Sequence, residues 1–114
     1  MNHRLTKQKA LLFAASFFFC ASAQAVDAGA ANDLIWSNNC AKCHHSTDKK
    51  DKEGSPYKEI AKKYRGDANA EAKLFEHLTT GPRVKAPDGS EDDHRIVRGN
   101  KAKIENLVKW ILAH

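Results

Sequence analysis

Apolar residues beyond position 25 recur at helical spacing in several stretches, and none of the stretches alternates as a half-buried strand does. The most regular stretch is residues 101–114, where five apolar side chains form one stripe: Ile104, Leu107, Val108, Ile111 and Leu112. Asn100 precedes it and is a suitable N-cap. A first helix is predicted from about Ala28 into the Cys40 region, with Leu34 and Ile35 on its apolar side and Trp36 beside them.

Two further helices are predicted in the middle of the chain. Ser55 and Pro56 favour a helix start, because a hydroxyl can cap the first turn and proline suits the first helical position. This helix is expected to end at Gly66, and the next is expected over residues 67–81. Residues 82–99 carry prolines, glycines and many charges, which predicts a long surface loop of a functional kind. The pattern predicts an all-α fold of about four helices.

The first 25 residues differ in character from the rest. They contain three basic side chains, an uncharged apolar run over residues 10–23, and the small-x-small sequence AQA ending at Ala25. This is the layout of a secretory signal, and the apolar run is short for a membrane span. We predict a cleaved signal peptide over residues 1–25, a domain over residues 26–114, a periplasmic location and no stable membrane anchor. The alternative is a retained N-terminal anchor.

Charge adds little to this picture. Three of the 19 Lys and Arg side chains fall in residues 1–25, so 16 basic side chains remain against 14 acidic ones. The charged run at residues 49–53 mixes both signs without interleaved aromatic residues, which indicates a solvated loop and no nucleic-acid partner. A domain this small commonly needs a covalent staple, and a disulfide between Cys40 and Cys43 would close too short a loop to stabilise much.

The sequence CAKCHH, residues 40–45, carries the candidate chemistry. Two cysteines separated by two residues and followed by histidine are the attachment signal of haem c. Cys40 and Cys43 would bond covalently to one edge of one porphyrin, and His44 would bind its iron as proximal axial ligand. The alternatives are a zinc site, for which no second C-x-x-C is present, a thioredoxin-like dithiol, which needs a βαβ unit, and an ordinary structural pair. The export signal favours haem.

With these motifs in hand, residues 26–114 resemble the short bacterial class I cytochromes c. LIWSNNCAKCH is similar to their first helix, SPYKEIAKKYRGDANAEAKL to their segment after the haem loop, and LVKWILAH to their closing helix. The resemblance implies a class I cytochrome c fold wrapped around one haem. It implies that the Pro56 carbonyl accepts a hydrogen bond from His44, and that Trp36 occupies a typical aromatic position. The family usually has glycine where the first and last helices cross, whereas this chain has Asn32 near that place.

The haem pocket is expected to be lined by apolar and aromatic side chains that could equally form ordinary core. These are Trp36, Ile60, Tyr64, Leu74, Phe75, Leu78 and Trp110.

The sixth iron ligand departs from the family pattern. Relatives supply a methionine from the loop before the last helix, but this chain has no methionine after Met1. Aligning KAP, residues 85–87, with the family's methionine-proline would place Ala86 at the ligand position and leave iron five-coordinate. Counting from the C-terminus instead favours His94, and imidazole is a good iron ligand. The alternative for His94 is an exposed loop histidine.

Other candidates have simpler explanations. His77 lies late in a predicted helix, where the helix dipole accounts for it. His45 adjoins the proximal ligand and cannot easily reach across the ring, and His114 is terminal and expected to be free. Asn100 could bind weakly, but capping already explains it.

These features favour a one-electron carrier with transient redox protein partners, acting alone or as a subunit of a larger redox complex. With histidine on both iron faces, the reduction potential is expected to be lower than in methionine-ligated relatives. The alternative is a haem protein with an open or labile sixth site that binds a small diatomic ligand. An enzyme is not expected, because no paired carboxylates or nucleophile–base spacing accompany the haem motif.

Overall fold

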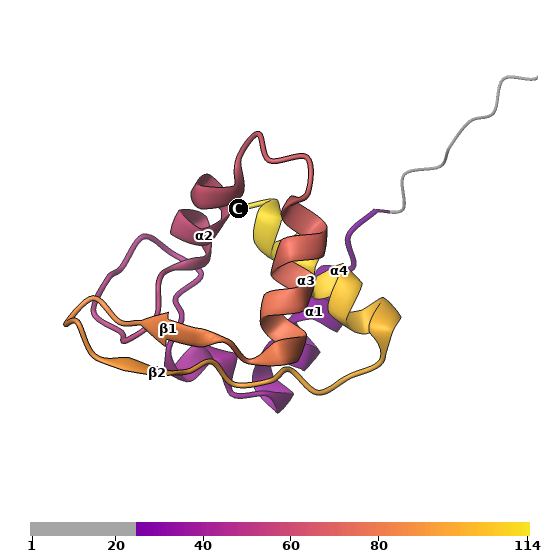
Figure 1. Ribbon diagram of the computed structural model, residues 1–114. Helices are drawn as coiled ribbons and strands as arrows, with labels where there is room; N and C mark the ends of the chain where they lie inside the picture. The colour runs from indigo at the N-terminus through magenta and orange to yellow at the C-terminus, as the bar shows by residue number, and fades with distance from the viewer. Residues whose placement is uncertain (1–24) are drawn as a thin grey trace, which may run out of the picture.

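The computed structural model describes residues 25–114, so the predicted signal peptide lies almost wholly outside the described residues. Within this range the chain forms four α-helices, one 3-10 turn and a two-stranded hairpin (Figure 1). Their bounds are α1 Ala28–Ser37, η1 Cys40–Lys42, α2 Tyr57–Tyr64, α3 Ala70–Thr80, β1 Arg83–Lys85, β2 Glu91–Asp93 and α4 Lys101–Leu112. Among the described helices, none has the length and hydropathy to cross a membrane.

Helix α4 packs against each of the other three helices and organises the core. Its residues Leu107 and Val108 are each only 1% exposed. At the start of the domain, the Asp27 backbone N–H donates to Asn106 Oδ1 (2.9 Å), and Asn106 Nδ2 returns a bond to the Asp27 carbonyl (2.8 Å). This reciprocal pair fixes the first turn of α1 against α4.

A small residue does lie at the packing face of α1, but it is not Asn32. Ala31 is 0% exposed within the core that α1 shares with α4, whereas Asn32 is exposed to solvent. The methyl group of alanine allows a close helix approach almost as well as glycine does. Asn32, which stands near the place of the family's usual glycine, is therefore not at the contact between α1 and α4; its neighbour Ala31 is.

Most of the predicted helix ends are confirmed. The Asn100 side chain caps α4 by accepting from the Lys103 backbone N–H (2.9 Å), and α3 ends at Gly81 in the left-handed conformation (φ 63°). The predicted cap at Ser55 is wrong. Helix α2 begins at Tyr57 with Pro56 at the N-cap position and no side-chain cap. Ser55 lies in the preceding loop, and its carbonyl accepts a hydrogen bond from the His44 side chain.

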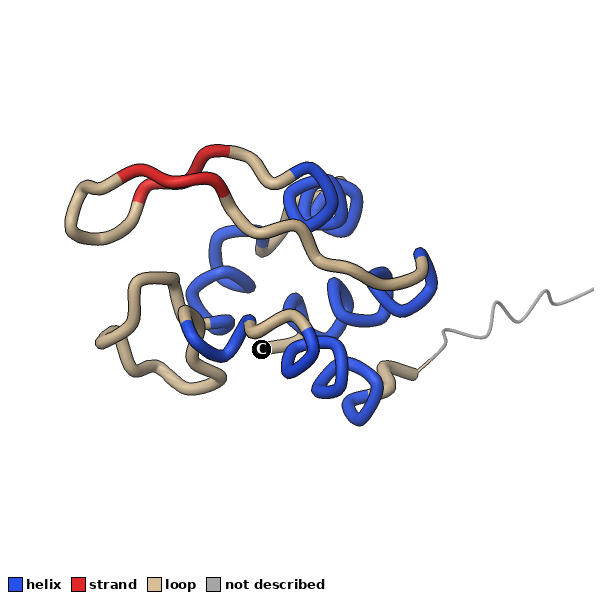
Figure 2. The backbone as a smooth tube through the Cα atoms, turned by 90° about the horizontal axis from the view of Figure 1, so that it is seen from below, coloured by secondary structure: helices blue, strands red, loops and turns tan. Residues whose placement is uncertain are grey.

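The absence of strands was a wrong prediction, although the fold class is confirmed. Strands β1 and β2 pair antiparallel with Arg83 opposite Asp93 and Lys85 opposite Glu91, and Gly89 (φ 87°) forms part of the connection. Arg83 lies 3.8 Å from carboxylate oxygens of both Glu91 and Asp93. Figure 2 shows the hairpin and the loop between η1 and α2 extending to the same side of the helices. The segments after His44 and before His94 therefore share one side of the molecule.

Candidate haem site

The attachment motif is shaped by a tight turn directly after α1. Asn39 enters it in the left-handed conformation (φ 57°), which asparagine tolerates better than most residues. The Cys40 carbonyl then accepts from the backbone N–H groups of both Cys43 (3.1 Å) and His44 (3.0 Å). Both thiols are free and partly exposed. The turn thus gathers the two tethers and the imidazole within one short segment.

The His44 imidazole is oriented by a backbone carbonyl. His44 Nδ1 lies 2.6 Å from the Ser55 carbonyl oxygen. Because a carbonyl can only accept, Nδ1 carries the proton and Nε2 keeps the lone pair that a metal needs. Burial lowers the pKa of His44, which also favours the neutral ring. The side chain is therefore held in a metal-binding tautomer.

The acceptor implied by the family resemblance was wrong by one residue. The Pro56 carbonyl accepts instead from the backbone N–H groups of Glu59 (3.0 Å) and Ile60 (3.1 Å), in the first turn of α2. The preceding carbonyl, that of Ser55, does not accept a hydrogen bond in the first turn of α2 and instead faces His44. Pro56 is buried and places Ser55, but it does not bond the imidazole.

Gly54 allows the loop to approach His44 closely. Its N–H donates to the Cys43 carbonyl (2.9 Å). A Cβ at this position would lie 2.6–2.7 Å from two ring atoms of His44 and 2.7 Å from the Cys43 carbonyl oxygen. Earlier in the loop, Asp51 Oδ1 lies 2.5 Å from His45 Nε2, and Lys52 Nζ donates a hydrogen bond to the Ala41 carbonyl. The charged run is mostly exposed, as predicted, yet it is tied to the attachment motif.

His94 lies directly after β2, at the base of the hairpin. Its backbone N–H donates to the Pro82 carbonyl (2.9 Å), and Val97 donates to the Leu78 carbonyl (2.8 Å) at the end of α3. The His94 side chain is half-buried, so the alternative of an exposed loop histidine does not hold. Its Nδ1 is buried and has no hydrogen-bond partner within residues 25–114.

The two imidazoles have the spacing that a shared metal ion requires. The ring centres of His44 and His94 are 6.1 Å apart, with ring planes tilted by 40°. An imidazole nitrogen binds a first-row metal at about 2 Å, and its ring centre lies roughly 1 Å behind it, so two rings sharing one ion have centres about 6 Å apart. The two imidazoles therefore fit a shared iron ion, and the two thiols of the attachment motif fit covalent bonds to the porphyrin.

His77, which the sequence offered as a further candidate ligand but which its helix-end position already explained, lies beside His94 in the structure. Its ring centre is 4.6 Å from that of His94, with the planes tilted by 60°. Burial is the main cause that lowers the pKa of both side chains. We call His44, His77 and His94 the histidine cluster. No local signal marks His77, because its neighbour His94 is brought in by the hairpin.

Tyr57 was missed, although its position after Pro56 offered a clue. It is 4% exposed, and its ring stacks against His44 with centres 5.5 Å apart and planes 26° apart. Trp110 meets it edge-on at 5.2 Å. Its hydroxyl is buried without a hydrogen-bond partner in the described structure, and burial raises its pKa far above the usual range. The prediction of a free His114 is wrong, because its Nδ1 lies 2.9 Å from the Trp110 carbonyl.

The side chains predicted to line the haem pocket lie in different surroundings. Trp36 is 73% exposed and lies at the rim of a cavity of about 170 Å³ that also includes His44, Tyr57 and Trp110. Tyr64 is half-buried against the core, with the Lys63 ammonium 5.9 Å above its ring centre. The remaining predicted lining residues, Ile60, Leu74 and Leu78, pack in or against the core. Trp36 thus borders the cavity beside His44 without being enclosed.

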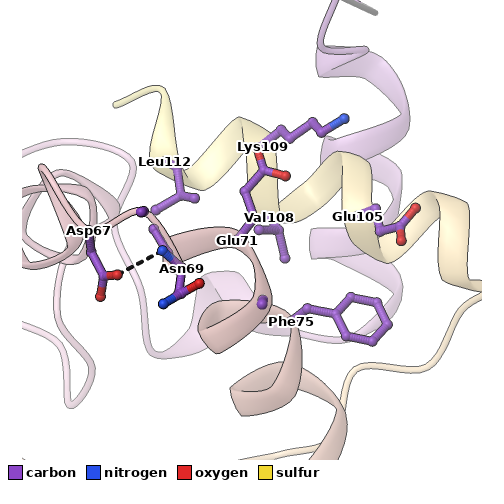
Figure 3. Close-up of a pocket in the computed structure, with 11 residues that line it drawn as sticks. Asp67, Asn69, Glu71, Phe75, Glu105, Val108, Lys109 and Leu112 are labelled. Atoms are coloured by element: carbon purple, nitrogen blue, oxygen red, sulfur yellow. Dashed lines mark hydrogen bonds between the residues drawn. The ribbon is translucent and has the colours of Figure 1, made fainter.

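A larger groove lies elsewhere, between α3 and α4. It has a volume of about 780 Å³, and Figure 3 shows Phe75 beside it with Glu71, Glu105 and Lys109 around it. None of the histidine cluster lines this groove. Phe75 therefore lies between two helices, in a groove that none of the three histidines lines.

Comparison with known proteins agrees with this geometry. Residues 28–114 match the sequence model of the family described as cytochrome c, so the chain belongs to that family. A class 1 cytochrome, MtoD from Sideroxydans lithotrophicus ES-1, is 49% identical with a TM-score of 0.73; the match covers 78% of this chain and 97% of that one. The chain is a short class I monohaem cytochrome c, a haem electron carrier, with one haem c attached through Cys40 and Cys43.

Two structures of cytochrome c552 from Nitrosomonas europaea are more distant. The N64Del mutant is 26% identical with a TM-score of 0.55, over 72% of this chain and 96% of its own. The wild-type protein is 28% identical with a TM-score of 0.54, over 71% and 95%. A comparison with curated protein sequences found no match.

Proposed function

We propose that this cytochrome is a periplasmic one-electron carrier whose haem iron is bound by His44 on one face and His94 on the other. The observation that carries the proposal is the 6.1 Å separation of the two ring centres, in a chain with no methionine after Met1. When bound, the haem supplies an iron that changes charge by one electron without making or breaking a bond.

The protein's own residues hold the two imidazoles in different ways. The Ser55 carbonyl and Gly54 fix His44 within the attachment segment, while the Pro82 carbonyl and the end of α3 hold the His94 backbone. Two imidazole nitrogens stabilise ferric iron more than a nitrogen and a thioether do. The reduction potential is therefore expected to lie below that of methionine-ligated relatives.

We also propose a periplasmic location and redox protein partners. Residues 1–25 have the layout of a cleaved export signal, and class I cytochromes c are typically periplasmic, so residues 26–114 are proposed as the exported haem domain. Redox proteins are proposed to dock transiently through small, charge-steered contacts, or to hold the cytochrome as a subunit of a larger complex. No nucleic-acid partner and no catalytic role are proposed.

The test is the ferric and ferrous absorption spectrum of haem-loaded His94→Ala beside the wild type. The variant is expected to change from low-spin to high-spin iron and to bind carbon monoxide rapidly when reduced. His114→Ala, which removes another half-buried histidine, is the matched control and is expected to keep the wild-type spectrum. A His94→Ala spectrum identical to the wild type would contradict the ligation.

One observation favours a second candidate, a labile sixth site that admits a small diatomic ligand. His94 follows a hairpin of two three-residue strands that are largely exposed, and such isolated hairpins are only marginally stable. Rapid carbon monoxide binding by the reduced wild-type protein would favour this candidate over the carrier.

A further inference from the structure

The ammonium group of Lys52 lies against the turn to which the haem is attached. Its Nζ donates a hydrogen bond to the carbonyl of Ala41, and Ala41 lies between the two tethering cysteines, Cys40 and Cys43. The Lys52 side chain is half-buried, unlike most of the charged run around it. A positive charge is therefore held at the edge of the site where the haem is bonded.

The same side chain lies close to His44. Lys52 and His44 both line the cavity of about 170 Å³ beside the attachment motif. Burial is the main cause that lowers the pKa of His44; the Ser55 carbonyl opposes it, and the Lys52 ammonium adds to it. A charge that disfavours a proton on His44 also disfavours additional positive charge on an iron at the same site.

No carboxylate neutralises this ammonium. Among the ion pairs of residues 25–114, none includes Lys52. The two flanking carboxylates are exposed: Asp51 binds His45, and Glu53 Oε2 lies 4.0 Å from Cys43 Sγ. Exposed charges are screened by water and salt more than a half-buried one is. The positive charge of Lys52 is therefore the one that acts most strongly on the site from this loop.

The loop that carries Lys52 is fixed on both sides of it. Directly before it, Asp51 Oδ1 lies 2.5 Å from His45 Nε2. Two residues after it, the Gly54 N–H donates to the Cys43 carbonyl (2.9 Å). These contacts hold the Lys52 backbone at the attachment turn, so the ammonium keeps its place beside the haem edge.

We propose that Lys52 is a fixed charge that raises the reduction potential of the haem iron by favouring its ferrous form. Ferrous iron carries one positive charge less than ferric iron, so a nearby ammonium repels it less. The inference goes beyond the ligation proposed for His94, because it needs only the haem attached through Cys40 and Cys43. Its direction is opposite to that expected from a second imidazole ligand.

The size of the effect follows from Coulomb's law. For a half-buried charge that is near the iron without touching it, an effective dielectric constant of about 20 or more gives roughly a threefold to tenfold change in the redox equilibrium. A tenfold change corresponds to about 59 mV for a one-electron couple. Removing the charge of Lys52 should therefore lower the potential by about 30–60 mV.

The test is a redox titration, followed by absorption, of the haem-loaded wild type, Lys52→Gln and Lys52→Arg. Lys52→Gln keeps a hydrogen-bond donor but loses the charge, so its potential should fall by about 30–60 mV with an unchanged ferric spectrum. Lys52→Arg keeps the charge and should remain near the wild type. The matched control is Lys49→Gln, which removes an exposed charge from the same loop and should shift the potential by less than Lys52→Gln.

Three results would overturn the proposal. One is a Lys52→Gln potential equal to the wild type, and another is an equal fall in the Gln and Arg variants, which would indicate the contact geometry alone. The third is an equal fall in Lys49→Gln, which would indicate the net charge of the molecule. If Lys52→Gln does not load haem, Lys52→Met provides the same readout. Failure of the His94 ligation is separate, because it is detected as a His94→Ala protein with an unchanged ferric spectrum.

Discussion

Replacing Gly81 by alanine tests how the end of α3 holds His94, the proposed second iron ligand. Gly81 has a φ of +63°, and an added Cβ would lie 2.6 Å from the His94 carbonyl oxygen and 3.0 Å from Ile96 Cγ1. The left-handed conformation costs a residue with a Cβ about 1–2 kcal/mol. Overpacking against a backbone oxygen that cannot rotate away adds about 1–3 kcal/mol. The expected loss in free energy of unfolding is about 2–5 kcal/mol.

Gly66 provides the matched control. It has a similar positive φ of +82°, but nothing lies within 4 Å of an added Cβ. Gly66→Ala should therefore lose only the conformational term of about 1–2 kcal/mol. The difference between the two variants, measured by guanidinium unfolding, isolates the contact with the His94 backbone.

The same pair of variants has a spectroscopic readout. Because relief of the contact must move the His94 backbone, reduced Gly81→Ala should bind carbon monoxide faster than the wild type. Gly66→Ala should not differ from the wild type in this respect. Equal destabilisation by the two substitutions, with unchanged carbon monoxide binding in both, would refute the placement of His94 against Gly81.

Three further predictions address the rest of the domain. Gly54→Ala, whose Cβ would meet His44 and Cys43 at 2.6–2.7 Å, should cost about 1–3 kcal/mol and lower the yield of haem-loaded protein; a normal yield and stability would contradict the packing. Leu107→Ala should cost about 2–5 kcal/mol in guanidinium unfolding while leaving the absorption spectrum unchanged. Stability should also fall as the pH drops below about 6.5, the ordinary histidine pKa, because the histidine cluster binds fewer protons when folded than when unfolded. Unfolding measured from pH 8 to pH 5 should show this decline, and a flat profile would contradict it.

Local signals predicted the helices because their causes are local. The cap at Asn100 and the left-handed stop at Gly81 each depend on a few neighbouring residues, and the stripe of α4 needs only its own spacing. The attachment motif is equally local, which is why a haem attached through Cys40 and Cys43 could be predicted from six residues.

The hairpin escaped prediction because its strands lack an apolar face. Each strand has three residues, most of them charged and exposed, so the sequence shows no alternation of apolar and polar residues that would indicate a strand. A turn signal was nevertheless present in the sequence APDGS, since Pro-Asp-Gly marks a tight turn. Cross-strand charges at Arg83 and Asp93 add to it.

The finer contacts of the site could not be derived from sequence spacing. The shift of the acceptor from Pro56 to Ser55 depends on where the first turn of α2 begins, which spacing defines only to within a residue or two. Helical periodicity placed Trp36 beside the apolar side of α1, but its large ring lies past the edge of the core. The pairing of His77 with His94 depends on the hairpin fold.

Electron paramagnetic resonance of the ferric wild-type protein tests the central claim most directly, because it reports the ligands on both faces of the iron. Iron held between His44 and His94 should give one low-spin signal typical of two imidazoles and no high-spin signal. A predominantly high-spin ferric signal would contradict the account.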